Sequence, residues 1–127
     1  MTTTLNQFIK DNNIKMTVTQ ISERPDLKWD DANHFKCRLK NKNKSITIYY
    51  SQGYGITNDP STESVLNALL VDFWNHDMSF SEFCSNYGYS EDSLSALKTF
   101  KLCSKNSLKV KKLFNGSLND FLNCENL

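Results

Sequence analysis

Residues 35–50 read FKCRLKNKNKSITIYY, and the alternation of side chains in this stretch decides the fold. Apolar residues occupy every second position on both sides of a central run of Asn and Lys, and basic or hydroxyl-bearing residues stand between them. Successive side chains of a strand point to opposite faces, so the pattern predicts a β-hairpin with one apolar and one polar face. Lys42 and Lys44 lie in or beside the turn. The polar face is expected to carry Lys36, Arg38 and Lys40 beside Thr47 and Tyr49.

Two elements are expected before the hairpin. Thr4 and Gln7 are spaced as in a helix capping box, which predicts a short helix that ends near residues 12–13. Residues 14–21, IKMTVTQI, alternate at period two and predict a strand. The next segment, SERPDLKWDDAN, has the composition of a loop, and its Trp29 is expected to anchor that loop on the body of the protein.

A loop and several helices are expected after the hairpin. The segment SQGYGITNDPSTE is rich in turn residues, and either Asp59 or Ser61 is expected to cap the helix that follows it. Apolar residues then recur at i, i+3, i+4, i+7 and i+8, a spacing that predicts a helix with one buried stripe. The stripe consists of Leu66, Leu69, Leu70, Phe73 and Trp74.

The C-terminal part of the chain predicts three more helical segments. Ser79 and Glu82 form another capping-box pattern before a short helix that should end at Gly88. Residues 94–114 carry one apolar seam and predict a long helix, and residues 117–122 predict a final helical turn. The seam consists of Ala96, Phe100, Cys103, Ser107, Val110 and Phe114. Together the elements predict the α+β class, with an antiparallel sheet and three or four C-terminal helices on one of its faces.

The length of 127 residues suits a single domain, 1–127, with the first helix and the sheet in residues 1–53 and the helical part in residues 59–124. A hydrophobic content of 39% is enough for one core and excludes a globally disordered chain. No apolar run approaches the roughly 18 residues of a membrane span, and the first residues do not resemble a signal peptide. We therefore expect a soluble, cytoplasmic protein.

The charged residues are sorted along the chain. The long helix predicted for 94–114 contains no acid, and five of its lysines fall within about 80° of helical arc. This lysine stripe consists of Lys98, Lys101, Lys105, Lys109 and Lys112. Between Lys44 and Lys98 the chain has no Lys or Arg, and an acidic surface is expected there. Its candidate residues are Glu63, Asp72, Asp77, Glu82, Glu91 and Asp92.

Stacked like charges at i,i+4 destabilise a helix by a few tenths of a kcal/mol per pair. We therefore expect a compensation for the repulsion between the lysines of the stripe. Three compensations are open. The acidic helices of the same chain could pack beside the stripe, an acidic partner could bind it, or salt could screen it as a solvated face.

The sequence contains no motif for catalysis, a cofactor or a metal. The four cysteines are far apart, without a CxxC or Cys/His cluster, and predict reduced thiols, of which Cys37, Cys84 and Cys103 lie on predicted apolar faces. His34 has no Ser, Cys or carboxylate beside it, and His76 with Asp77 is better explained by the end of a helix. Gly53 and Gly55 alone do not make a phosphate-binding loop. We expect neither an active site nor a bound cofactor.

Two functional classes remain. The order of a helix, three strands and a helix is also that of double-stranded-RNA-binding domains, which carry a lysine cluster at the start of the helix after the third strand. Here that position reads DPSTESVLNAL and is acidic, so only the basic hairpin face, with Tyr49 as a stacking surface, supports nucleic-acid binding. The other class is a binding module that docks onto a larger macromolecule through oppositely charged surfaces.

Three short motifs carry a family resemblance: YYSQGYGI, DPSTESVLNAL and FSEFCSNYGYSEDSLSALKTFKLC. They resemble motifs of small proteins encoded by bacteriophages, prophages and other mobile elements, over about Met16 to Phe114. The matching positions are Tyr49, Tyr50, Ser51, Gly53, Pro60, Val65, Leu66, Tyr87, Gly88, Tyr89, Asp92 and Ser93. The chain departs from the pattern where such proteins carry arginine, in the hairpin and after the Asp-Ser pair.

The resemblance implies a genomic setting and no particular chemistry. Small accessory proteins of mobile elements often block host defences by binding, as anti-CRISPR proteins do. The resemblance therefore implies a non-enzymatic inhibitor in the cytoplasm of a bacterial host, with a defence protein or ribonucleoprotein as its partner. A small nucleic-acid-binding protein is the alternative.

Overall fold

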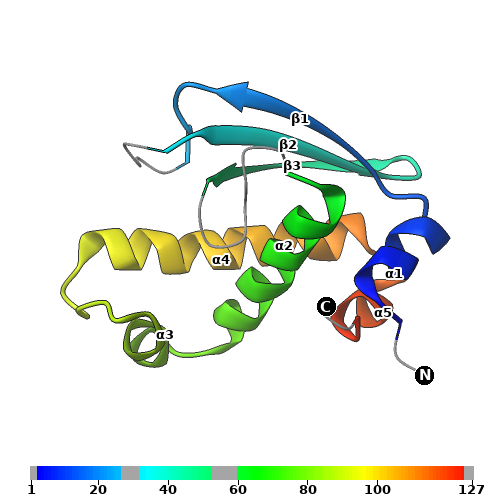
Figure 1. Cartoon of the computed structure of the whole chain (residues 1–127). Coiled ribbons are helices and arrows are strands. Elements are labelled where there is room, and N and C mark those ends of the chain that lie inside the picture. Colours follow the sequence, from blue (N-terminus) through cyan, green and yellow to red (C-terminus); the bar gives the residue numbers. More distant parts are fainter. Residues whose placement is uncertain (1–2, 27–31, 53–59, 125–127) are drawn as a thin grey trace.

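The computed structural model describes residues 3–26, 32–52 and 60–124. Its elements, shown in Figure 1, are α1 (Leu5–Asp11), β1 (Lys15–Ile21), β2 (His34–Asn41), β3 (Lys44–Ser51), α2 (Thr62–Asp77), α3 (Phe80–Tyr87), α4 (Leu94–Leu113) and α5 (Leu118–Leu122). The predicted α+β fold is confirmed: a short helix precedes a three-stranded antiparallel sheet, and helices follow it.

The sheet has the strand order β1-β2-β3, and both neighbouring pairs are antiparallel. The hairpin register places Cys37 opposite Ile48 and Arg38 opposite Thr47, so the apolar residues share one face and the basic ones the other, as the alternation of the sequence predicts. Lys42 begins the turn in the left-handed conformation, with φ 57°. The apolar residues of β2 and β3 that face the helices are buried: Phe35, Cys37, Leu39, Ile46 and Ile48.

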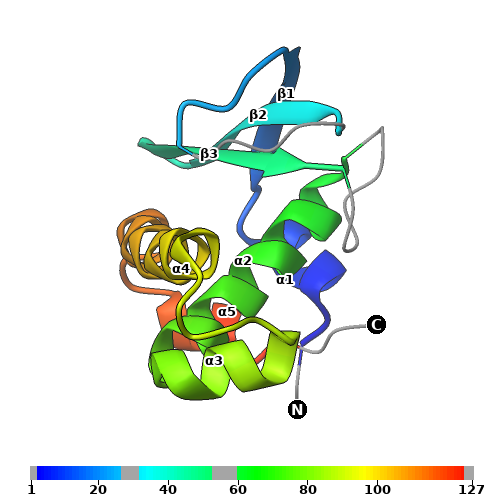
Figure 2. The ribbon, with the colours of Figure 1, turned by 90° about the vertical axis from the view of Figure 1, so that its left-hand side faces the viewer.

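The helices lie together on one side of the sheet, as the perpendicular views of Figures 1 and 2 show. α2 and α4 cross beneath the sheet, α1 packs next to α5 at one end of this layer, and α3 lies at the other end. The larger of two core clusters draws buried side chains from α1, the sheet, α2, α4 and α5, and a smaller one joins α3 to α4. The sheet and most of the helices expected from the sequence therefore share the larger core.

Three phenylalanine rings explain why the last helical turn forms. Phe121 of α5 packs against Phe8 of α1 and Phe114 at the end of α4, with ring centroids 5.6 Å and 4.6 Å away. Burying an aromatic side chain contributes roughly 1.5–3 kcal/mol, which a five-residue helix could not supply from its own hydrogen bonds. The short C-terminal helix is held by the core.

Hydroxyl side chains begin four of the helices. Thr4, Ser61, Ser79 and Ser93 each accept a hydrogen bond from the backbone N–H three residues later. Ser61 is thus the N-cap of α2, whereas Asp59 lies outside the described residues. Gly88 ends α3 as predicted, in the left-handed conformation that glycine adopts at little cost.

One prediction about the core is wrong. Trp74 was assigned to the buried stripe of α2, yet its side chain is 51% exposed, while the other four members of the stripe are buried. Trp74 lies about 100° of helical arc from Phe73, which puts it at the margin of the stripe. The predicted anchor Trp29 and the glycines at 53 and 55 lie outside the described residues.

Candidate binding surface

The face of the sheet turned away from the helices is the first candidate surface. Its three cross-strand rows are Lys15-Lys40-Ser45, Thr17-Arg38-Thr47 and Thr19-Lys36-Tyr49, and we call these nine residues the sheet exterior. All six residues from β1 and β2 are exposed, and the three from β3 are half-buried. The rows combine four basic side chains with hydroxyl groups and one aromatic ring, and they contain no acid.

The hairpin tip continues this basic surface. Lys42 is exposed in the turn, and Lys44 is half-buried. The Lys44 ammonium donates a hydrogen bond to the backbone carbonyl of Asn115, 3.5 Å away, so it lies next to the C-terminal end of α4. The tip therefore brings the basic hairpin and the last turn of the lysine helix together.

The lysine stripe runs along α4, whose outer side forms the margin of the molecule in Figure 2. Lys98, Lys101, Lys105 and Lys112 are exposed, as predicted. Between described residues, the ion pairs within 4.0 Å are Arg24 with Asp26 and His76 with Asp77, and neither involves this helix or the hairpin. Of the three compensations considered for the stripe, neutralisation by acidic helices of the same chain is not observed in the described part of the molecule.

Lys109 differs from the other lysines of the stripe. Its ammonium donates a 2.7 Å hydrogen bond to the backbone carbonyl of Thr47 in β3, and the side chain is half-buried. Burial lowers the pKa of Lys109, and Lys105 acts in the same direction, whereas Asp26 opposes the shift. Lys109 therefore covers an edge-strand carbonyl with a donor and is not available as a binding residue.

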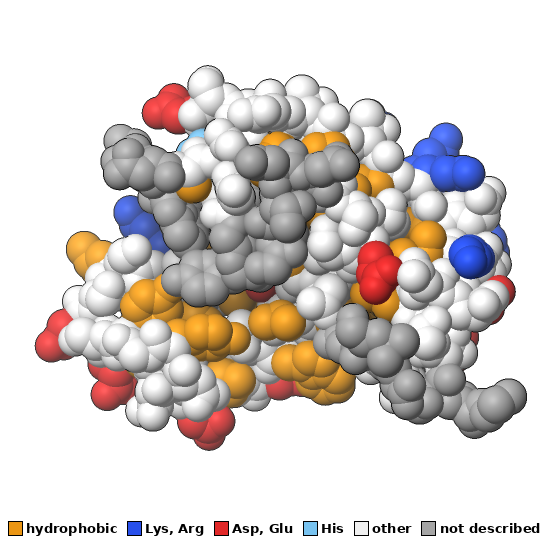
Figure 3. Space-filling view, viewed as in Figure 1, with side chains coloured by type: hydrophobic (Ala, Val, Ile, Leu, Met, Phe, Trp, Pro, Cys, Tyr) orange, Lys and Arg blue, Asp and Glu red, His pale blue; other side chains and the backbone are white. Residues whose placement is uncertain are grey.

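The candidate acidic residues separate into an exposed group and two exceptions. Four are exposed: Asp77 at the end of α2, Glu82 on α3, and Glu91 and Asp92 in the turn before α4. Figure 3 shows acidic side chains gathered at this end, beside a group of hydrophobic ones, with Lys and Arg only at the margins of that face. Glu63 is half-buried in the first turn of α2, where its charge faces the positive end of the helix dipole.

Asp72 was predicted on the acidic surface, and the structure corrects this. Its carboxylate lies between α2, α4 and the sheet, where Asn106 donates to it at 2.8 Å and the Tyr50 hydroxyl at 3.1 Å. The Cys103 thiol lies 3.8 Å from its other oxygen. Burial raises the pKa of Asp72, and these three donors oppose that rise. Asp72 is therefore a half-buried acceptor for α4 and β3 and does not belong to the exposed acidic group.

The phenol and the thiol around Asp72 are held in their protonated forms. Burial, followed by the charge of Asp72, raises the pKa of Tyr50 well above its ordinary value. The same two causes raise the pKa of Cys103 to about 12, and burial raises that of Cys37 to about 11. Both thiols therefore stay neutral near pH 7, in agreement with the prediction of buried, unreactive cysteines.

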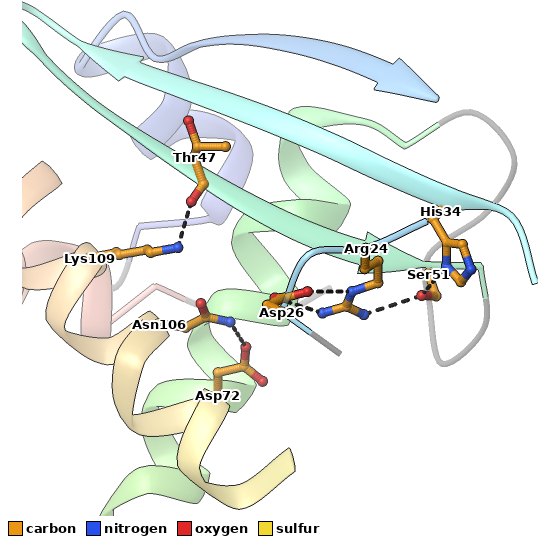
Figure 4. A network of polar contacts seen from close by, with 8 residues as sticks. All are labelled: Arg24, Asp26, His34, Thr47, Ser51, Asp72, Asn106 and Lys109. Carbon is orange, nitrogen blue, oxygen red and sulfur yellow. Dashed lines mark hydrogen bonds and ion pairs between the residues drawn. The ribbon is translucent and has the colours of Figure 1, made fainter. Parts of the chain in front are cut away.

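A second polar network lies at the end of the sheet (Figure 4). The Arg24 guanidinium, on the segment after β1, donates to both oxygens of Asp26 at 2.9 and 3.1 Å and to the Ser51 hydroxyl at 3.2 Å. Ser51 also lies 2.8 Å from Nδ1 of His34. All of these side chains except Asp26 are buried, and each has a polar partner, so the network ties the first loop to β2 and β3.

Sequence reasoning did not find either network. Arg24 and Asp26 were assigned to a loop, and Asn106 was absent from the predicted seam of α4. One signal was present: Asn106 lies between the seam residues Cys103 and Val110, three and four residues away, which places it on the inner side of the helix.

Within the described residues, no group of three or more His, Cys, Asp or Glu side chains is arranged to hold a metal ion. The Ser51 and His34 pair is 8% and 6% exposed, and the serine oxygen also faces the Arg24 guanidinium. No helix in the described part of the chain has the length and apolar character that crossing a membrane requires.

Comparison of this chain with protein-family models, with curated proteins and with solved structures found no match.

Proposed function

We propose that this chain is a non-catalytic binding protein that docks onto a macromolecular partner through its basic surfaces, and that the partner is a host defence complex. The observation that carries the proposal is the α4 stripe, where four exposed lysines stand on one helix face without a carboxylate from the described residues within 4.0 Å. The resemblance of the sequence motifs to those of mobile-element proteins supports a defence protein or ribonucleoprotein as the partner.

The charge distribution suits docking. Uncompensated lysines repel each other along α4, and a partner carboxylate relieves that repulsion as it forms its own contact. A one-signed patch also attracts an acidic partner from a distance and raises the association rate. A binding protein of this kind would block its target stoichiometrically by covering a surface, as anti-CRISPR proteins do, and would need no active site.

The test compares two charge-reversed proteins in defence-bearing hosts. Lys98, Lys101 and Lys105 are changed together to Glu in one variant, and Lys10, which is exposed on α1, is changed to Glu in the control. We expect the wild-type chain and the control to co-purify with the same defence complex and to inhibit it at a one-to-one ratio. The triple variant should do neither. Identical capture by all three proteins, or no saturable partner in several hosts, would reject the proposal.

Nucleic-acid binding is a second candidate, and the composition of the sheet exterior favours it. Lys36, Arg38 and Lys40 lie on adjacent rows about 7 Å apart, beside Tyr49 and without an acid. Such a face can neutralise phosphates and stack a base. It cannot bind as a double-stranded-RNA-binding domain does, because the first turn of α2 carries Glu63 where those domains carry lysines.

Gel retardation of a single-stranded and a double-stranded oligonucleotide tests this candidate. If the three basic residues contact phosphates, changing all of them to Ala should reduce the slope of log affinity against log salt by about 2 to 3. Changing Lys98, Lys101 and Lys105 together to Ala serves as a matched control, since it removes the same number of positive charges from another surface. Absence of retardation at low salt would exclude this candidate.

A further inference from the structure

The outer side of α4 carries more than lysines. Six of its exposed residues are separated alternately by four and three positions, and we call them the α4 outer face: Leu94, Lys98, Lys101, Lys105, Leu108 and Lys112. The spacing follows from the helix itself, because one face of any helix repeats in this way. The residue types do not follow from the helix, since they are only leucine and lysine.

The two leucines are the most exposed large apolar side chains of the described residues, at 74% for Leu94 and 62% for Leu108. They lie 14 positions apart, which is roughly 21 Å along a helix. Lys101 stands midway between them, seven residues from each. Leucine favours the helical conformation at an exposed position, and covering each of the two would in addition contribute to association.

The arrangement fits a second helix lying along α4. Residues spaced by three and four positions interdigitate with the same spacing on a partner helix that crosses at about 20°. The aliphatic stems of Lys98, Lys101 and Lys105 can cover the apolar contact between the leucines while their ammonium groups reach acidic side chains at its margins. The partner helix needs an apolar residue near each end and carboxylates between them.

A second copy of α4 does not satisfy this requirement. In the antiparallel register that brings Leu94 of one copy opposite Leu108 of the other, Lys101 would face Lys101, and the lysines between the leucines would oppose like charges with no carboxylate to pair with them. The phosphates of a nucleic acid would neutralise the lysines, but they would make no favourable contact with the leucines. We infer that the α4 outer face is the docking site for an acidic amphipathic helix of a partner protein. This inference rests on the proposed binding function.

The test uses a synthetic helical peptide and the full-length chain. The peptide carries two leucines 14 positions apart, with glutamates at the positions that would face the four lysines, and a control peptide has the same composition with this spacing scrambled. We expect the spaced peptide to bind at least tenfold more tightly in a fluorescence anisotropy titration. Leu94→Ser and Leu108→Ser should each weaken it about tenfold, whereas Lys10→Glu should not.

Each other outcome has a definite meaning. Equal affinity for the two peptides, or binding that the leucine substitutions leave unchanged, would show attraction by charge alone. The helix-docking inference would then fail while the proposed function stands, provided that the α4 charge reversal still abolishes partner capture. A spaced peptide that is helical and does not bind would also reject the inference. Dimerisation of the chain that Leu94→Ser abolishes would assign this face to a second copy instead.

Discussion

Polar side chains on the two sides of α4 differ in whether they have a partner within the molecule. Asn106 on the inner side, and Lys109 at the margin of the stripe nearest β3, have fixed partners in α2 and β3, at 2.8 Å and 2.7 Å. One turn from Lys109, Lys105 is exposed and has no carboxylate from the described residues within 4.0 Å. The comparison shows that the more buried polar residues of this helix stabilise the fold, whereas the exposed ones are available for contact with another molecule.

The largest loss of stability should come from a substitution on the inner side of α4. Asn106→Ala removes a donor from the buried Asp72 carboxylate and should lower the free energy of unfolding by about 2–3 kcal/mol at pH 7. Lys101→Ala on the outer side should change it by less than about 0.5 kcal/mol. Urea unfolding of both variants measures the contrast, and equal losses would show that the two sides are not distinct.

The pH dependence of stability should sharpen the same contrast. Because burial raises the native pKa of Asp72, the folded state holds its proton above the ordinary aspartate pKa of about 3.9. The unfolding free energy contributed by this group should therefore fall as pH rises from that value through the native pKa, and then stay constant. Hydrogen bonds donated to the carboxylate oppose the rise of its pKa. This fall in the free energy of unfolding should therefore be smaller than the loss that Asn106→Ala causes.

Unfolding of the wild type and of Asp72→Asn is measured between about pH 3 and pH 8, a range that spans the titration of an aspartate with a raised pKa. The amide keeps an acceptor for Tyr50 and Asn106 but cannot ionise. Relative to the wild type, the variant should gain stability as pH increases. A difference that does not change with pH would mean that the carboxyl titrates normally.

Two lysines one turn apart provide a matched pair. Lys109→Ala leaves the Thr47 carbonyl without its donor and should cost about 1 kcal/mol, whereas Lys105→Ala should be neutral to within about 0.5 kcal/mol. Lys109→Met keeps the length of the side chain and separates lost packing from the lost hydrogen bond. If Lys105→Ala costs as much as Lys109→Ala, the assignment of different roles is wrong.

The smallest effect should have the opposite sign. Lys101→Glu relieves repulsion along α4, since the new carboxylate would face Lys105 four residues later and Lys98 three residues earlier. Stability should rise by about 0.3–0.5 kcal/mol at low salt and the gain should fade at high salt. Thermal unfolding at the two salt concentrations measures it. A loss of stability would show that the wild-type lysine already has a stabilising contact.

The sequence predicted the fold well because its signals are local. Alternation in residues 35–50 predicted both strands of the hairpin and their faces, and Ser79 and Gly88 predicted the ends of α3. The exposure of the hairpin and α4 lysines followed from the same periodicity. What periodicity cannot tell is which distant element packs against which side of a helix. Asp72 was misplaced for this reason, because α4 and Tyr50 of β3 cover the side of α2 on which it lies.

Trp74 and Lys109 also show that periodicity alone does not predict which side chains a distant element covers. Trp74 belongs to the apolar spacing of α2, yet no described element covers that margin of the helix sufficiently to bury it. Lys109 belongs to the charged spacing of α4, yet β3 comes close enough to use its ammonium. The network of Arg24 and Ser51 joins residues 27 positions apart, and nothing in either local segment signals the other.

The hydrogen bond from the Asn41 side chain to the carbonyl of Leu113 joins residues 72 positions apart in the chain. A ribosome adding roughly 5–20 residues per second needs about 4–14 s to make the second residue after the first. During that interval the sheet can pair its strands, but the helix that covers β3 does not yet exist. The nascent chain therefore passes through a stage with Ile46 and Ile48 only partly sheltered, and chaperone binding during translation would act at that stage.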